Sequence, residues 1–405
     1  MLLKLAWRNL WRSKQRTFIT MASVFLAVML SSMLASFKEG VLDLMVENTV
    51  GKFTGYIQIH SKGYWDEPSL DLSFEFTDSL RQLLNEHEGI TGYTSRIEGF
   101  SLASSGELTR AAMVTGTDPE NEEQNTGLSE RVIEGEYLEP GDKAVLVGAG
   151  LAEFLKLKAG DTLVLFGQGY RGMTSSGLYP IKGIVKIGSP EMSRQVVFLP
   201  MEEAQYFFAT GPQITAAVIF IDDPDEAEQI AEELRASLDT AKYEVMPWKE
   251  LVPDMVRMVQ SEEQEQYVFM FILYVVISFG IFGTVLMMMA EREHEFGMLV
   301  AIGMKRIQLA LMVFIEILVM VIIGAIAGML AVFPIALYFN MNPVSFGEEM
   351  AKMYSDYGLE PVLQTAVTPG LFIQQAVVVA IIAFVISIYP FLRLLRLNAI
   401  EAMRK

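Results

Sequence analysis

The chain has 405 residues, of which 52% are hydrophobic, and a formal net charge of −18. This acidity excludes the basic face that nucleic-acid recognition requires, and the absence of cysteine excludes disulfides, iron–sulfur clusters and thiol catalysis. The three histidines are scattered, with no second histidine after His294-Glu295 to complete a zinc helix, and no phosphate loop ending in Gly-Lys-Ser/Thr occurs. The sequence therefore predicts no catalytic residue, metal site or cofactor in this chain.

Residues 1–16 are predicted to form an amphipathic helix on the cytoplasmic side of a membrane. One helical face is apolar and another is cationic, formed by Leu3, Trp7, Leu10 and Trp11 and by Lys4, Arg8 and Arg12, respectively. Such a helix lies in the headgroup region with its tryptophans at the interface. The same basic residues also suit a flank that only sets topology, and the two interpretations are compatible.

Four apolar runs are each long enough to cross a bilayer, which takes about 20 residues. They are residues 17–37, 267–290, 307–339 and 371–392. The third run is overlong, and Pro334 near its end predicts a kink or an exit from the membrane, because proline removes a backbone donor. Small residues at four-residue spacing predict close helix contacts within or between chains. They are Ser23, Ala27, Ser31, Ala35, Gly280, Thr284, Gly324 and Gly328.

The orientation of these spans follows from their basic flanks. Lysines and arginines crowd the residues before the first span and the tail at 393–405, so both termini are predicted to be cytoplasmic. Residues 38–266 and a short loop at 340–370 then lie on the outer side. Residues 51–266 hold 17 Lys+Arg and 37 Asp+Glu, a net charge of −20, so the acidity belongs to this loop. We expect a multi-pass membrane protein whose first span is a retained anchor and not a cleaved signal peptide.

The large loop at 38–266 is predicted to be a mixed α/β domain. Its apolar residues alternate in some segments and follow a helical period in others, with turn residues between them. The expected strands are 55–60, 110–116, 144–147, 162–166 and 178–188, and the expected helices are 77–88, with Thr77 as the N-cap, 150–157 and 225–238. Gly167–Gly177 is rich in glycine and serine and is expected to be a flexible hairpin-like loop. Two small subdomains are expected, one inserted in the other.

The segment between the second and third spans, residues 291–306, combines charge with apolar surface. Residues 291–295 are polar or charged, residues 296–302 are largely apolar, and Gly303 ends the predicted helix. A simple solvated connector would not need those apolar side chains. The pattern suits a helix that a docking partner grips, although an interfacial helix without a partner would have the same composition.

Motifs along the chain resemble those of the FtsX-like permeases. Residues 291–303, EREHEFGMLVAIG, resemble the signature E-R-x-x-E-[IF]-G-x-L-x-A-x-G. The opening at 5–17 and the closing NAIEAMR at 398–404 are similar to the ends of that family, although Asn398 stands where proline is usual. In the loop, GTDP at 116–119 and LKLKAGD at 155–161 resemble turns of the family's periplasmic core domain. The family comprises ABC transporter subunits, among them the lipoprotein-releasing LolC/LolE pair and the membrane half of MacB.

The resemblance implies an α-helical membrane protein with four transmembrane helices in 1+3 order plus a mixed α/β extracytoplasmic domain. That domain would be a MacB-like periplasmic core of two subdomains, Porter and Sabre, on a protein of the bacterial inner membrane. Residues 291–306 would be the cytoplasmic coupling helix that receives an ABC ATPase. The matching residues expected to couple the two proteins are Glu291, Arg292, Glu293, Glu295, Phe296, Gly297, Met298, Leu299, Ala301 and Gly303.

By this resemblance the chain is a non-catalytic permease subunit, and a separate ATPase subunit, present in two copies, binds ATP and magnesium. A second permease chain, identical or paralogous, completes the complex, with membrane lipids and a periplasmic chaperone or adaptor as further partners. The expected function is to convert ATP hydrolysis into periplasmic movements that release or export lipoproteins or other amphiphiles. The alternatives are export of a drug, peptide or toxin, and mechanical regulation of a cell-wall hydrolase without transport. A membrane-anchored sensor or adhesion module, outside the family, would not need the coupling segment.

Two further sites are expected. Glu316 is the only ionisable residue in the third run, where a carboxyl is costly unless it is neutral, paired or facing an aqueous or protein interior. It serves either a structural hydrogen bond to a neighbouring helix or a contact with substrate or gate. LolC-like permeases project a hook toward their chaperone at the place of Gly167–Gly177. Tyr170, Arg171 and Met173 would anchor such a partner, unless the loop is a plain hairpin.

Overall fold

The computed structural model describes residues 14–345 and 362–398, which fall into two compact units. The helical unit comprises residues 14–43 and 258–345 together with the second described range, and the α/β unit comprises residues 44–257. Most of the predicted N-terminal amphipathic helix and the end of the C-terminal tail lie outside the described residues.

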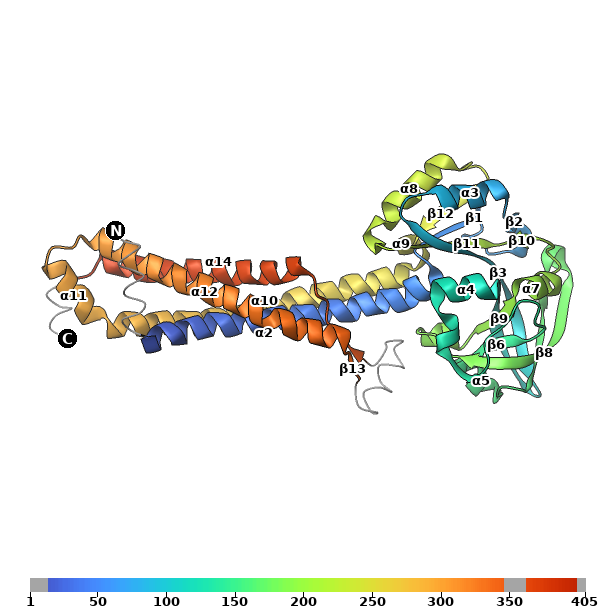
Figure 1. The fold of residues 1–405 in the computed structure, drawn as a ribbon, viewed down its shortest axis with the longest axis horizontal. Coiled ribbons are helices and arrows are strands. Elements are labelled where there is room, and N and C mark those ends of the chain that lie inside the picture. The colour runs from blue at the N-terminus through green and yellow to red at the C-terminus, as the bar shows by residue number, and fades with distance from the viewer. Residues whose placement is uncertain (1–13, 346–361, 399–405) are drawn as a thin grey trace. The chain divides into compact units, whose positions relative to one another are not determined.

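Four helices in the described residues are long and apolar enough to cross a membrane. They are α2 (Lys14–Val46), α10 (Pro253–Glu291), α12 (Arg306–Met341) and α14 (Pro369–Leu395) (Figure 1). The boundary between the units falls inside α2 and α10, so both helices continue beyond the predicted spans. Helix α12 does not end at Pro334 but continues to Met341. Pro334 lacks one backbone N–H, but in apolar surroundings the other N–H and C=O groups are still best satisfied by a continuous helix.

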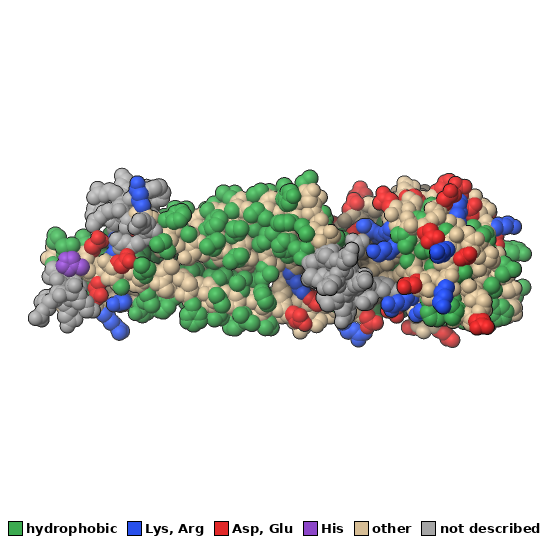
Figure 2. Space-filling model, turned by 90° about the horizontal axis from the view of Figure 1, so that it is seen from below, with side chains coloured by type: hydrophobic (Ala, Val, Ile, Leu, Met, Phe, Trp, Pro, Cys, Tyr) green, Lys and Arg blue, Asp and Glu red, His purple; other side chains and the backbone are tan. Residues whose placement is uncertain are grey.

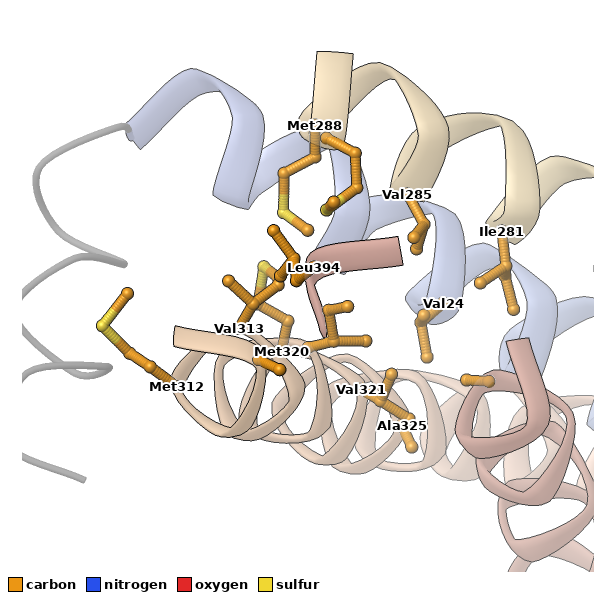
Figure 3. Packing of buried hydrophobic residues seen from close by; sticks show 14 of the residues in the cluster. Val24, Ile281, Val285, Met288, Met312, Val313, Met320, Val321, Ala325 and Leu394 are labelled. Atoms are coloured by element: carbon orange, nitrogen blue, oxygen red, sulfur yellow. The ribbon is translucent and has the colours of Figure 1, made fainter. Parts of the chain in front are cut away.

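The helical unit is held together by a core of aliphatic and methionine side chains. In Figure 3, Val24 of α2, Val285 of α10, Val321 of α12 and Leu394 of α14 belong to one cluster. Other large hydrophobic side chains of the same helices are exposed, and hydrophobic side chains cover much of the face of this unit that Figure 2 shows. Such a surface suits contact with lipid, and the buried cluster fixes the helices to one another.

Two glycines let α12 and α2 approach closely. A Cβ atom added at Gly324 would lie 2.8 Å from the Met21 carbonyl oxygen, and one at Gly328 would lie 2.8 Å from that of Phe25. At these positions the predicted small-residue contacts are made within the chain. Gly280 of α10 differs, because an added Cβ atom there would meet no described atom within 4 Å.

The segment before α14 is fastened to α2 and α12. Ala366 and Ser36 exchange two hydrogen bonds, from the Ala366 N–H to the Ser36 carbonyl (2.8 Å) and from the Ser36 hydroxyl to the Ala366 carbonyl (2.5 Å). The Thr365 hydroxyl donates to the Ala336 carbonyl of α12 (2.6 Å). Gly40 makes room for the segment, since a Cβ atom there would lie 2.5 Å from one of its backbone oxygens. The start of α14 is therefore fixed to two other helices.

The α/β unit is built on one ten-stranded sheet. Its strands are β1 (Ile57–Ser61), β3 (Ile90–Ser105), β4 (Leu108–Thr117), β5 (Val132–Gly135), β6 (Val145–Gly148), β7 (Thr162–Gln168), β8 (Thr174–Val185), β9 (Val196–Pro200), β11 (Ala216–Ile221) and β12 (Tyr243–Pro247). The strand order is β12-β1-β11-β3-β4-β9-β6-β8-β5, and β7 pairs with β3 and β8. Two small sheets join β2 (Phe74–Glu75) to β10 (Gln213–Ile214) and, in the helical unit, β13 (Val344–Ser345) to β14 (Val362–Leu363).

Short helices cover this sheet (Figure 1). They are α3 (Asp78–Glu86), α4 (Pro119–Thr126), α5 (Ala149–Leu155), α6 (Pro190–Ser193), α7 (Met201–Phe208), α8 (Ala227–Ser237) and α9 (Trp248–Leu251), with a π-helical segment at Glu47–Thr54 and 3-10 turns at Leu70–Leu72, Leu128–Arg131, Tyr170–Gly172 and Pro224–Glu226. The Thr77 side chain accepts a hydrogen bond from the Leu80 N–H (3.3 Å), which confirms it as the N-cap of α3.

Two main hydrophobic cores divide the α/β unit, in agreement with the predicted pair of subdomains. One core includes Ile219 and Leu234 and lies among β1, β11, α3 and α8. The other includes Val147 and Leu163 and lies among β4, β6, β7, α5 and α7. The segment from β4 to α7 is inserted between β3 and β10. Strand β3 belongs to both parts, because its first half pairs with β11 and its second half pairs with β4 and β7.

The predicted flexible loop at Gly167–Gly177 is wrong in extent. Strand β7 continues to Gln168 and β8 begins at Thr174, with Phe166 opposite Ser176 and Gln168 opposite Thr174. Glycine and serine content suggested a loop, but cross-strand pairing and the neighbouring strand β3 extend the ladder through them. The turn itself is a tight one that ends the hairpin.

Candidate functional site

The segment between the second and third long helices forms a separate short helix, α11 (Glu293–Ala301). Helix α10 ends at Glu291, and Arg292 leaves the helical conformation, with φ −104° and ψ 7°. At the other end Gly303 has a φ of 112°, a backbone conformation that side-chain-bearing residues rarely adopt. The structure therefore confirms the predicted end of the short helix at Gly303. Figure 1 shows α11 at one end of the helical unit, between the ends of α10 and α12.

One face of this segment is buried in the helical unit. Arg292 and Phe296 have relative exposures of 4% and 1%, and Gly297 is also buried. The Arg292 Nη1 donates to the Glu316 Oε1 of α12 at 2.7 Å, and both side chains are at most 5% exposed. The Arg292 guanidinium also lies 5.0 Å from the centre of the Phe296 ring and donates to Glu295 at 3.4 Å. A buried charge is tolerated when it is paired in this way.

The pairing with Arg292 bears on the two roles expected of Glu316. The carboxylate accepts a hydrogen bond from the junction of α10 and α11, 24 residues away in the sequence. This contact supports a structural role, in which Glu316 fixes the short helix to α12. Sequence reasoning treated Arg292 and Glu316 as separate sites, and the structure brings them together.

The opposite face of the segment is exposed. Glu291, Met298, Ala301 and Gly303 lie on it, as does Ile302, which is 85% exposed. Exposed His294, Lys305 and Arg306 extend the same surface. His294 and Ile302 were missed as site residues, although their spacing from Met298 on a helix would have placed all three on one face. We call His294, Met298 and Ala301, together with Glu291 at the end of α10 and Ile302 directly after α11, the exposed face of α11.

Two of the expected coupling residues have intermediate positions. Leu299 is partly buried and packs against the core of the helical unit, so it belongs to the fold as much as to a docking surface. Glu293 lies 3.8 Å from the Arg393 guanidinium of α14. Helix α11 is therefore connected to both α12 and α14 by charged contacts.

The expected partner residues of the β7–β8 hairpin lie in the other unit. The Arg171 guanidinium stacks 5.0 Å from the Tyr170 ring centre, and its backbone N–H donates to Asp71 Oδ1 at 2.7 Å. Met173 is 58% exposed. Among the described residues there is no group of three or more His, Asp or Glu side chains that could hold a metal ion.

A multi-helix membrane protein with an α/β domain between its first and second long helices is the class that these features define. Residues 17–237 match the MacB-like periplasmic core domain, and residues 267–399 match the FtsX-like permease C-terminal domain. The chain therefore belongs to the FtsX-like permease family, as its motifs predicted. It is a non-catalytic ABC transporter permease with an extracytoplasmic domain, and its family implies an ATPase partner.

Individual relatives are distant. The lipoprotein-releasing system transmembrane protein LolC of Xylella fastidiosa (strain 9a5c) is 23% identical over 331 residues, 78% of each chain. LolC of Neisseria meningitidis serogroup B is 21% identical over 213 residues, 50% of this chain and 51% of the relative. The periplasmic region of MacB from Actinobacillus actinomycetemcomitans is 14% identical, with a TM-score of 0.36, and the match covers 54% of this chain and 97% of that one.

Proposed function

We propose that the exposed face of α11 docks an ABC ATPase on the cytoplasmic side. In this proposal the Arg292–Glu316 pair passes the movement of the ATPase to α12. The observation that carries it is the division of one short helix into a buried charged face and an exposed face with apolar residues at its centre. A helix with only a lipid-interface role would need no buried ion pair to fix its direction.

The outward path of this movement is given by chain connectivity. Helices α2 and α10 each contribute residues to both units, so a displacement of either helix acts on the extracytoplasmic domain through continuous backbone. Helix α10 ends directly at Arg292. ATP-driven displacement of α11 would therefore act on α10 through the backbone and on α12 through the ion pair.

The proposed complex contains two permease chains and two ATPase subunits, because ABC ATPases act as pairs and this chain offers one docking helix. Both termini are proposed to be cytoplasmic, supported by the basic residues that flank the outer spans. The complex is proposed to lie in the bacterial inner membrane. A periplasmic chaperone or adaptor would bind the β7–β8 hairpin through Tyr170, Arg171 and Met173.

The proposed cargo is a lipoprotein or another amphiphile. Support comes from the LolC proteins, whose name describes a lipoprotein-releasing system and which align with 78% of this chain in the Xylella case.

The docking proposal is tested by changing Met298 and Ile302 together to aspartate. Their side chains are 42% and 85% exposed, so the fold should tolerate the charges while an apolar docking surface would not. Tagged chain is purified in a mild detergent from its native host, and the co-purifying ATP hydrolysis is measured. The control changes Ile133 and Leu178, 61% and 70% exposed in the α/β unit, to aspartate. Loss of ATPase in the first variant alone supports docking on α11, and equal ATPase recovery from both variants would refute it.

A further inference from the structure

The α/β unit contains a cavity of about 480 Å³. Its walls are mainly apolar and aromatic, with Tyr64, Trp65, Leu70, Phe100 and Met113 among the lining residues. A cavity of this size and lining suits a small organic ligand. Trp65 and Phe100 are 40% and 63% exposed, so the cavity is open to solvent at its edge.

Two acids line this cavity, Glu98 and Asp71, and the exposed Asp71 already accepts a hydrogen bond from the Arg171 N–H. Glu98 lies on β3, and its side chain is on the same side of the strand as those of Arg96 and Phe100, two residues away in either direction. In the part of the chain that the structure describes, Glu98 forms a hydrogen bond through its backbone N–H, to Thr215, and none through its carboxylate. Burial raises the pKa of the Glu98 carboxyl, an effect that Arg96 opposes and Glu122 strengthens. A carboxylate in such surroundings is costly without a counter-charge.

Arg96 meets that need only in part, because its guanidinium makes its hydrogen bonds to other groups. It donates from Nε and Nη2 to the Glu122 carboxylate at 3.2 and 2.5 Å, and from Nη1 to the Phe53 carbonyl at 2.5 Å. Arg96 and Glu122 are each at most 2% exposed. When Glu98 is ionised, this group of two acids and one arginine carries one net negative charge. Arg96 and Glu98 both line the cavity, and of these two the Arg96 side chain is the one bonded to Glu122.

Other groups at the cavity suit a cation with an apolar body. Tyr64 and Trp65 offer aromatic faces, which attract organic cations through their ring quadrupoles. The Gln58 amide at the wall is already hydrogen-bonded, to the Thr54 carbonyl and to the His60 ring. The Thr54 hydroxyl is buried beside the cavity and has no hydrogen-bond partner among the described residues. The Thr54 hydroxyl is therefore free to bind a ligand at a site whose walls are mainly apolar.

We propose that this cavity binds a monovalent organic cation with an apolar body, and that Glu98 balances the charge of the cation. Aromatic side chains hold the apolar body, and the Glu98 carboxylate selects the sign of the charge. The site belongs to one unit of the chain and depends neither on the ATPase nor on α11. Its existence is thus independent of the proposed docking function.

The test uses the purified full chain in a neutral maltoside detergent, with hexyltrimethylammonium as the cationic probe. Hexanesulfonate has the same alkyl length and opposite charge. Isothermal titration should show saturable binding of the cation, no comparable binding of the anion, and at least about a tenfold loss of cation affinity in Glu98→Gln. Glu98→Asp keeps the charge and should retain most of the affinity. Empty micelles provide the blank for partitioning of the probes.

The matched control is Glu107→Gln, which removes the same charge from the exposed turn between β3 and β4. Its affinity for the cation should equal that of the parent chain. The proposal is overturned if the parent chain does not bind the cation, if it binds the anion equally well, or if Glu98→Gln binds as the parent does. Thermal unfolding of each variant shows whether it is folded. If Glu98→Gln is unfolded, the comparison of cation with anion on the parent chain and on Glu98→Asp decides.

Discussion

Replacing Arg292 with methionine tests the connection between α11 and α12. The change removes the guanidinium that lies 2.7 Å from Glu316 while keeping an unbranched apolar stem of similar length. Both side chains are at most 5% exposed, so water does not replace the lost partner. Removing one member of such a buried pair costs about 3–5 kcal/mol.

A second ion pair in the same region provides the comparison. Arg393 and Glu293 lie 3.8 Å apart with side-chain exposures of 38% and 24%, so solvent screens their attraction. Arg393→Met should therefore cost no more than about 1 kcal/mol. The double variant of Arg292→Met with Glu316→Met should be more stable than Arg292→Met alone, because no unpaired charge is left in the interior.

Unfolding of the purified chain in mixed micelles with increasing dodecyl sulfate measures these differences, with the circular dichroism of the helices as the signal. We expect Arg292→Met to unfold at clearly lower denaturant than Arg393→Met, and the double variant to recover part of the loss. Equal stability of Arg292→Met and the parent chain would show that the pair does not fix α11. A double variant that is less stable than Arg292→Met would also contradict this account of the ion pair.

Three further outcomes are expected. Gly40→Ala should lower the free energy of unfolding by about 1–3 kcal/mol, because the added methyl group would lie 2.5 Å from a backbone oxygen. Gly280→Ala adds its methyl group to open space and should not destabilise the chain in the same dodecyl sulfate assay. Gly303→Ala forces a side chain into a φ of 112° and should reduce the ATPase activity that co-purifies with the chain, without loss of expression. Burial raises the pKa of Glu98, so the folded chain holds this proton more tightly than the unfolded chain does. The resulting contribution to stability is fully present below the pKa of Glu98 in the unfolded chain and is lost as pH rises through its pKa in the folded chain. Calorimetric affinity for the cation should accordingly fall as pH is lowered through the folded pKa, and Glu98→Gln should abolish this dependence.

Local sequence patterns were sufficient for features that neighbouring residues decide. Thr77 was predicted as a helix cap and accepts the expected hydrogen bond, and the break at Gly303 follows from a conformation that glycine favours. The hairpin after β7 was mispredicted because the strand β3, which pairs with it, is about 60 residues away in the sequence. Composition alone does not reveal such a partner.

The candidate sites show the same limit. The motif identified α11, but not which of its side chains face inward, since that depends on the position of Glu316 in another helix. The cavity is even less accessible to sequence reasoning, because Gln58, Glu98 and Met113 come from three strands and the lining extends to Val252. Charge counting found the acidity of the loop but could not show that Glu98 lines a mainly apolar cavity.

Strand β3 has a mechanical consequence for the extracytoplasmic domain. A single 16-residue strand pairs with β11 at one end and with β4 and β7 at the other, so a rigid ladder of hydrogen bonds runs through both cores. Sliding one core past the other would require breaking main-chain bonds along a shared edge. The two cores should therefore move together as one rigid body when α2 or α10 is displaced.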